Sequence, residues 1–328
     1  MKKHFTTAKN SFVIAVLLVA PAVKAADLKP EAVQRWDEYV AMVDERNQTH
    51  RAHGNSFLAS DEIPGQMMKL RDGEIIVTPA DKHIPLKVCS GLIHDWIGAA
   101  FIPNTTIGDV LSTVRNYDRY VEFYQPNVVM SKALLKAELK DRYSIVMMNK
   151  SVVAKTALDA DYQTTYVAVD EHRWYSISDS TRMQEIAEYG TPAQHILPEN
   201  HGTGLIWRLH TVTRFEEKDG GVYIEIEGVA LSRDIPSAFR WMVEPIVRRV
   251  SRSSLTTSLR ETESAVFASS RTASQDRLTC VSAKACVQYK PAPAAKSGTP
   301  GKAGSLMSWA ASKAVGPQTW ASRDARLN

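Results

Sequence analysis

Apolar and polar residues alternate with a period of two over much of the chain between Asn127 and Arg233. This alternation is typical of half-buried strands. Asp219-Gly220-Gly221 joins the last two segments and predicts a hairpin, and the short connections predict an antiparallel meander. The predicted strands are 127–137, 141–149, 152–169, 172–188, 204–217 and 221–233, and the longest break between them is 190–204.

Three other stretches place apolar residues at three- to four-residue spacing, which predicts helices. They cover 30–50, 104–125 and 234–268. In the second stretch, Thr106 precedes Asp109 by three residues, which predicts a capping box at the start of that helix. Two additional strands are expected at 73–77 and 88–102.

The N-terminus has the pattern of a cleavable secretory signal peptide. It begins Met1-Lys2-Lys3, continues with the apolar run Phe12–Ala20, and reaches small or medium residues at Val23 and Ala25. Nine apolar residues span only about half of a bilayer core, which needs roughly 20. We therefore expect cleavage after Ala25, a periplasmic or secreted location, and no transmembrane segment in the mature chain.

The charge is unevenly distributed. The formal net charge is +4, but the segment 1–25 carries four lysines and no acid. Residues 271–328 hold nine Lys/Arg and two Asp/Glu, so the body between these segments is acidic. An acidic body argues against a nucleic-acid groove. The segment 269–328 is rich in Ser, Ala, Lys, Pro and Gly and is predicted to be a disordered basic tail, which either touches an anionic envelope surface or is simply solvated.

The three cysteines do not have the spacing of a zinc site. In an oxidising compartment, Cys280 and Cys286 could close a small disulfide loop, whereas Cys89 lies in an apolar stretch and is expected to be a buried thiol. The chain contains no Gly-x-Ser-x-Gly elbow, phosphate loop or dinucleotide fingerprint. We therefore expect no cofactor and no metal.

The run GLIHDWIGAAFIPNTTIGDVLSTVRNYDRYVEFYQPNVVMSKAL at 91–134 gives a strand, a helix that ends in Tyr-Asp-Arg-Tyr-Val-Glu-Phe-Tyr, a proline and another strand. With the long closing helix after Ser232-Arg233-Asp234-Ile235-Pro236, this order resembles the START-like or SRPBCC superfamily, which has the helix-grip fold. The superfamily includes lipid-transfer START domains and polyketide cyclases, and the chain is most similar to exported bacterial members. The resemblance covers roughly 88–268.

The resemblance implies an α+β domain in which a curved antiparallel sheet of about seven strands wraps a long C-terminal helix, with one covered sheet face. It also implies a mostly apolar cavity between the sheet and that helix. The expected organisation is a signal peptide at 1–25, an N-terminal helical extension at 26–87, the START-like domain at 88–268 and the tail at 269–328. A helix-grip domain implies no particular reaction, because carriers, sensors and enzymes share this fold.

Two strands have mixed faces, which suggests polar groups inside the cavity. On 172–188 and 204–217, Arg182 or Arg208 could pair with an anionic ligand head group, and Trp174 or Trp207 could form an aromatic wall. The alternative for each arginine is a cross-strand ion pair on an exposed face. The full set of candidate cavity residues is Trp174, Tyr175, Arg182, Trp207, Arg208 and Phe239.

Several other polar residues are expected to be structural. Glu225 and Glu227 are expected to face water, because the opposite face of their strand is clearly apolar. His94 and Asp95 are neighbours on a strand and point to opposite faces, so they cannot form a dyad.

Three functions remain open. The first is an exported protein that binds a hydrophobic or amphipathic small molecule, such as a lipid, and carries or senses it without catalysis. The missing catalytic motifs favour this hypothesis. The alternatives are a cavity enzyme of the cyclase or hydrolase type and an envelope interaction protein that acts through its extension and tail.

Overall fold

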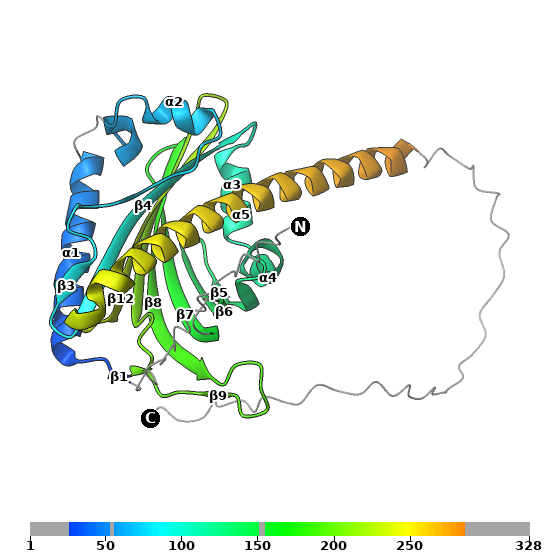
Figure 1. The fold of residues 1–328 in the computed structure, drawn as a ribbon. Coiled ribbons are helices and arrows are strands. Elements are labelled where there is room, and N and C mark those ends of the chain that lie inside the picture. Colours follow the sequence, from blue (N-terminus) through cyan, green and yellow to red (C-terminus); the bar gives the residue numbers. More distant parts are fainter. Residues whose placement is uncertain (1–25, 53–55, 151–154, 286–328) are drawn as a thin grey trace, which may run out of the picture. The chain divides into compact units, whose positions relative to one another are not determined.

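The computed structural model describes residues 26–52, 56–150 and 155–285, so the predicted signal peptide lies outside the described residues. The described part of the chain has an α+β fold built on a ten-stranded antiparallel sheet, with helix α5 (Ser237–Ala285) on one face (Figure 1). The strand order β2-β4-β12-β11-β8-β7-β6-β5 and the closing helix confirm the expected helix-grip arrangement, although ten strands replace the expected seven. The strands are β2 (Ile76–Pro79), β3 (Leu86–Val88), β4 (Gly91–Pro103), β5 (Val128–Lys136), β6 (Lys140–Lys150), β7 (Lys155–Ala168), β8 (Arg173–Ala187), β9 (His195–Ile196), β11 (Arg208–Lys218) and β12 (Gly221–Arg233).

The six strands predicted from period-two alternation are all present, with shifted ends. Asp219 and Gly220 form the predicted hairpin turn, and both have positive φ (56° and 77°), as a tight two-residue turn requires. The long break contains β9 and β10 (His201–Gly202), and β10 pairs with β1 (Ala26–Asp27). This pairing anchors the start of the described chain.

The strand predicted at 88–102 is two strands. Val88 ends β3, which folds back on β4 and pairs with Gly91. Ser90 makes this turn with a positive φ of 59°. The same turn exposes Cys89, so the prediction of a buried thiol was wrong.

The helix predicted at 104–125 is also interrupted. Helix α3 (Ile107–Val114) begins with the predicted capping box, in which the Asp109 amide donates to Thr106 Oγ1 at 3.2 Å. It ends at Val114, since Asn116 leaves helical geometry with ψ near 64°. A 3-10 turn, η2 (Tyr117–Arg119), and the short helix α4 (Tyr120–Phe123) follow.

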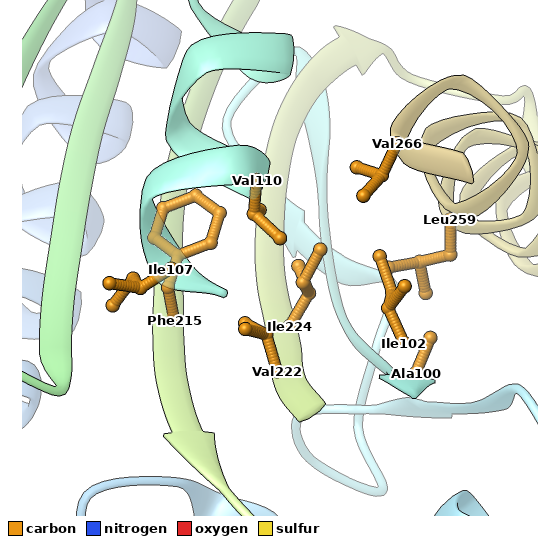
Figure 2. Close-up of a cluster of buried hydrophobic side chains, with 9 residues drawn as sticks. All are labelled: Ala100, Ile102, Ile107, Val110, Phe215, Val222, Ile224, Leu259 and Val266. Atoms are coloured by element: carbon orange, nitrogen blue, oxygen red, sulfur yellow. The ribbon is translucent and has the colours of Figure 1, made fainter. Parts of the chain in front are cut away.

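Helix α5 packs closely on one face of the sheet. A Cβ atom at Gly98 would lie 2.8 Å from Leu255 Cγ of α5, so glycine is needed where the helix crosses β4. Figure 2 shows Leu259 and Val266 of α5 on the same side of the sheet as Ile107 and Val110 of α3. Together they cover Ala100, Ile102, Phe215, Val222 and Ile224. The helix continues to Ala285, into the segment 269–328 that composition predicts to be disordered.

The opposite face is covered as well, over β4, β11 and β12. Helix α1 (Pro30–Ala52) confirms the predicted first helix and packs Trp36 and Val43 on this face. After it come the 3-10 turn η1 (Ala59–Glu62) and helix α2 (Gln66–Arg71). The expectation of one covered face was wrong because the N-terminal extension supplies a second apolar layer: Phe57, Leu58 and Leu70 against Ala99, Phe101 and Tyr223.

Candidate functional site

The sheet face that α5 covers carries a band of hydroxyl groups. Directly paired residues of an antiparallel sheet point to the same face. From Gly98, which touches α5, the pairing runs through Ile226, Thr213 and Ser176 to Tyr166, so these side chains share the α5 face. We define the hydroxyl band as Thr211, Thr213, Ser176, Ser178, Ser180, Tyr143, Tyr162, Thr164 and Tyr166.

Apolar side chains lie on both sides of this band. Ala100, Ile224, Phe215 and Trp174 form the neighbouring row at one end. At the other end, Ile145, Leu158, Ala160 and Met183 make a separate buried cluster. A ligand that crossed this face would therefore meet apolar groups at its ends and hydrogen-bonding groups at its middle.

Tyrosines dominate the part of the band that lies against η2 and α4. The ring of Tyr143 stacks on Tyr117 at 4.2 Å and on Tyr162 at 5.2 Å. Tyr120 meets Tyr143 edge-on at 5.8 Å and Tyr124 at 4.9 Å. These contacts form one aromatic surface from two short helical segments and two strands.

Asp141 anchors this surface at the start of β6. Its carboxylate is fully buried and accepts a bond from the Tyr117 hydroxyl at 2.8 Å. The Arg115 guanidinium donates to both Asp141 oxygens at 2.9 Å and lies 4.7 Å from the centre of the Tyr166 ring. This bidentate pair neutralises the carboxylate and fixes Tyr117 in place.

The tyrosines are neutral hydroxyls at physiological pH. Burial raises the pKa of Tyr124 to about 12 and raises the pKa of Tyr120 and Tyr143 above the usual value near 10. Burial also raises the pKa of Tyr117 and Tyr162. These groups can therefore donate hydrogen bonds, whereas a phenolate that removes a proton from a substrate is disfavoured.

The hydroxyl of Tyr162 is buried, with no hydrogen-bond partner among the described residues. Neighbouring hydroxyl groups are hydrogen-bonded to each other, since Thr164 Oγ1 donates to Ser178 Oγ at 2.8 Å. On the α5 side, Tyr124 and Thr262 hydroxyls meet at 3.0 Å. A buried hydroxyl without a partner costs free energy, so Tyr162 is a natural contact for a polar group of a ligand.

Of the predicted cavity residues, Trp174 lies on the α5 face, next to the hydroxyl band and against Phe215. Tyr175 points to the opposite face and packs on the cluster that includes Phe57. Trp207 also lies on that face, buried against Trp36. Phe239 is a residue of α5 whose side chain lies outside the described residues, as do the side chains of the predicted Cys280–Cys286 pair.

Arg182 and Arg208 both have protein partners. A bulge at Thr181 shifts the register, so Arg182 pairs with Asp161, the neighbour of Tyr162, and points away from the hydroxyl band. It donates to Asp159 and Asp161 at 2.8 and 2.9 Å, which is the cross-strand ion pairing considered as the alternative. Arg208 donates to Asn200 Oδ1 at 2.8 Å, and burial lowers its pKa.

Glu225 and Glu227 do not face water, contrary to the sequence expectation. Both are almost fully buried, because α1 and η1 cover their face of the sheet. Glu225 accepts from the amides of Ala59 and Ser60 at 2.9 Å, and Glu227 pairs with Arg46 of α1. These carboxylates bind the N-terminal extension to the sheet.

The remaining candidate chemistry is structural. His94 and Asp95 point to opposite faces, as predicted: His94 meets Ser232 at 2.9 Å, and Asp95 accepts from Tyr39 at 2.9 Å. Within residues 26–52, 56–150 and 155–285, no three His, Cys, Asp or Glu side chains are grouped to hold a metal ion. No helix in these ranges is both long enough and apolar enough to cross a membrane.

Sequence reasoning missed the tyrosines of β6 and β7. The signal was present, because Tyr143, Tyr162 and Tyr166 sit at alternating positions with Ile145, Ala160 and Thr164. Tyr117 and Tyr124 fall on one apolar stripe of the stretch 104–125, but a stripe alone does not reveal which strands it meets. The pairing of β6 with β7 and the packing of η2 and α4 on these strands bring the two sets together.

No family model matches the chain, and no curated protein matches it either. Among solved structures, a STAR-related lipid transfer protein from Xanthomonas axonopodis is 15% identical, covers 59% of this chain and 98% of its own, and has a TM-score of 0.38. Human STARD10 is 7% identical over 62% of this chain and 80% of its own, with a TM-score of 0.36. The Zhui aromatase/cyclase from Streptomyces is 9% identical over 52% of this chain and 94% of its own, with a TM-score of 0.34. At such TM-scores the likeness carries no functional argument, and the helix-grip assignment rests on the order of this chain's own elements.

Proposed function

We propose that this protein binds an amphipathic small molecule between the α5 face of the sheet and helix α5, and carries or senses it without chemical conversion. The observation that carries the proposal is the hydroxyl band, which places neutral hydrogen-bonding groups between two apolar zones. Five residues of the hydroxyl band are only half-buried although α5 covers this face, which favours a site that a ligand can reach. They are Thr211, Thr213, Ser178, Ser180 and Tyr143. A lipid-like molecule with a polar middle fits this pattern.

The neutral tyrosines support binding over catalysis. Tyr117 keeps its proton and donates to Asp141, whose charge is already neutralised by Arg115. A general base needs a pKa near the working pH, and raised tyrosine pKa values move away from it. A cyclase-type enzyme remains the second candidate because Asp141, Tyr117 and Tyr166 form a connected polar group on this face.

Native mass spectrometry of the protein recovered from its own host, followed by solvent extraction, tests the proposal. We expect a bound molecule of lipid size. An empty protein that also fails to bind lipids or an apolar fluorescent probe would contradict the proposal. Conversion of the bound molecule during incubation would instead favour the enzyme.

A pair of matched variants locates the site. Tyr162→Phe removes only the unpartnered hydroxyl, and we expect affinity for the extracted ligand to fall by roughly fivefold, the value of one hydrogen bond. Tyr175→Phe makes the same change on the opposite face and should bind as the wild type does. Equal affinities of the two variants would place the ligand elsewhere.

Export belongs to the same proposal. The N-terminal pattern of basic, apolar and small residues supports cleavage after Ala25 and a periplasmic or secreted carrier. Mass measurement of the protein from the cell envelope should give a chain that begins at Ala26. A chain that retains residues 1–25 and stays with the cytoplasmic fraction would contradict this part.

A further inference from the structure

Strand β5 and the turn into β6 expose large apolar side chains. Met130 is 62% exposed, and Leu134, Leu135 and Leu139 are between 45% and 48% exposed. Four such residues within eleven positions exceed the scattered apolar exposure of an ordinary surface. We name residues 130–140 the β5–β6 tip.

Lysines surround these apolar groups. Lys132, Lys136 and Lys140 are exposed, and Glu138 is the one acidic residue of the tip. The body of the chain is acidic, so this basic tip differs in charge from its surroundings. Exposed leucines flanked by lysines have the composition of surfaces that enter the interface of an anionic bilayer.

Strand addition by a protein partner is disfavoured, although β5 is an edge strand of the sheet. Its Ala133 amide already donates to Asp118 at 2.8 Å, and Ser131 Oγ accepts from the Val121 amide at 3.1 Å. Two register shifts in β5 break the regular edge that a second strand needs. The lysines also repel a second copy of the tip and the basic C-terminal segment.

Arg115 connects the tip to the candidate site. Its guanidinium donates to the carbonyl of Glu138 at 3.0 Å and to the carbonyl of Ala137, while it also holds Asp141. Asp141 in turn accepts from Tyr117, which stacks on Tyr143. The tip therefore has a fixed position beside the tyrosines.

We infer that the β5–β6 tip docks on anionic lipid bilayers by inserting Leu134, Leu135 and Leu139, while Lys132, Lys136 and Lys140 contact lipid phosphates. Bilayer docking by the tip is separate from ligand binding at the hydroxyl band, so either property can be absent while the other is present. The partner is identified by its chemistry: an apolar interior beneath a negatively charged surface.

Sedimentation with vesicles tests the inference on the full chain. The vesicles contain phosphatidylcholine alone, or phosphatidylglycerol in place of about a third of it. We expect binding to the anionic vesicles that weakens as salt rises. The variant L134S/L135S/L139S should lose roughly tenfold in partitioning, and K132Q/K136Q/K140Q should lose it only on anionic vesicles.

The matched control is M42S/I63S/M68S, which makes three equivalent changes at exposed apolar residues of the N-terminal extension. It should bind as the wild type does. Any contribution of residues 1–25 or of the basic tail is the same in every variant and cancels in the ratios.

A local probe measures insertion directly. In a C89S/C280S/C286S background, Leu135→Cys or Met68→Cys carries a polarity-sensitive fluorophore. We expect a blue shift with anionic vesicles at position 135 and none at position 68. No shift at position 135, or equal shifts at both positions, would overturn the inference. A variant L134S/L135S/L139S that loses a dimer but still binds vesicles would overturn it as well.

Discussion

Arg214 donates to Glu225 at 2.7 Å in the layer between the sheet and the N-terminal extension, where neither side chain is more than 6% exposed. Arg214 also lies 3.7 Å from Glu227, which pairs with Arg46 of α1. Two arginines, Arg46 and Arg214, thus pair with two glutamates and Asp95 in this layer. The extension is therefore joined to the sheet by charges as well as by apolar contacts.

Removing one charge from this layer should be costly. Arg214→Met keeps most of the side-chain volume but removes the positive charge beside Glu225 and Glu227. We expect a loss of about 3–5 kcal/mol in the free energy of unfolding, measured by chemical denaturation. Adding Glu225→Gln should recover part of the loss, because the uncompensated charge is then removed.

An exposed ion pair supplies the control for that prediction. Arg35 and Glu38 are paired at 2.7 Å, but their side chains are 61% and 47% exposed. Arg35→Met should change the free energy of unfolding by less than about 1 kcal/mol. Similar losses for Arg35→Met and Arg214→Met would show that burial of the second pair has little energetic effect.

His94 should make the fold sensitive to acid. Burial lowers its pKa to about 4, well below its ordinary value near 6.5. The folded state disfavours the charged ring, so the stabilisation from neutral His94 is complete above about pH 6.5 and is lost as the pH falls toward 4. At pH 5 this loss amounts to about 2 kcal/mol.

The variant His94→Gln isolates this effect. Glutamine keeps a polar group for Ser232 but does not titrate. The variant should lose about 2 kcal/mol less than the wild type between pH 7.5 and pH 5, by urea unfolding. Asp95 changes the stability in the opposite direction as the pH falls, because burial raises its pKa to about 6. Only the difference in stability between the variant and the wild type is therefore diagnostic of His94. Parallel stability curves would contradict the assignment.

Gly98 should be intolerant of larger side chains. A Cβ atom there would lie 2.8 and 2.9 Å from Leu255 and Leu259 of α5. Gly98→Val should lower the free energy of unfolding by about 1–3 kcal/mol through overpacking. Leu255→Ala in the same chain should relieve part of that cost. If the second change only adds to the loss, α5 does not cross β4 at this point.

Tyr162→Phe should increase the stability of the ligand-free protein. The tyrosine hydroxyl is buried without a partner among the residues that the structure describes, so its removal eliminates a desolvation cost of about 1 kcal/mol or more. Thermal unfolding of ligand-free protein measures the change. Tyr117→Phe is the contrasting variant, because its hydroxyl bonds Asp141 and its loss should destabilise the fold.

Local patterns along the chain were enough to locate most of the helices and strands. Period-two alternation located β5 to β8, β11 and β12, because alternate residues of a strand face different environments. The Thr106–Asp109 spacing located the start of α3, because capping is a local interaction. The order of these elements was enough to predict the helix-grip arrangement.

Which faces are buried and which residues come into contact depends on how distant segments pack together. Glu225 and Glu227 have the local pattern of exposed residues, but α1 and η1, which are distant in the sequence, cover them. The bulge at Thr181 directs Arg182 away from the face that carries Ser180, a change that alternation cannot reveal. Tyr117, Tyr143 and Tyr162 come together through strand pairing and the packing of η2 on the sheet. Local patterns record periodicity, but contacts between distant segments depend on the register and packing of the whole fold.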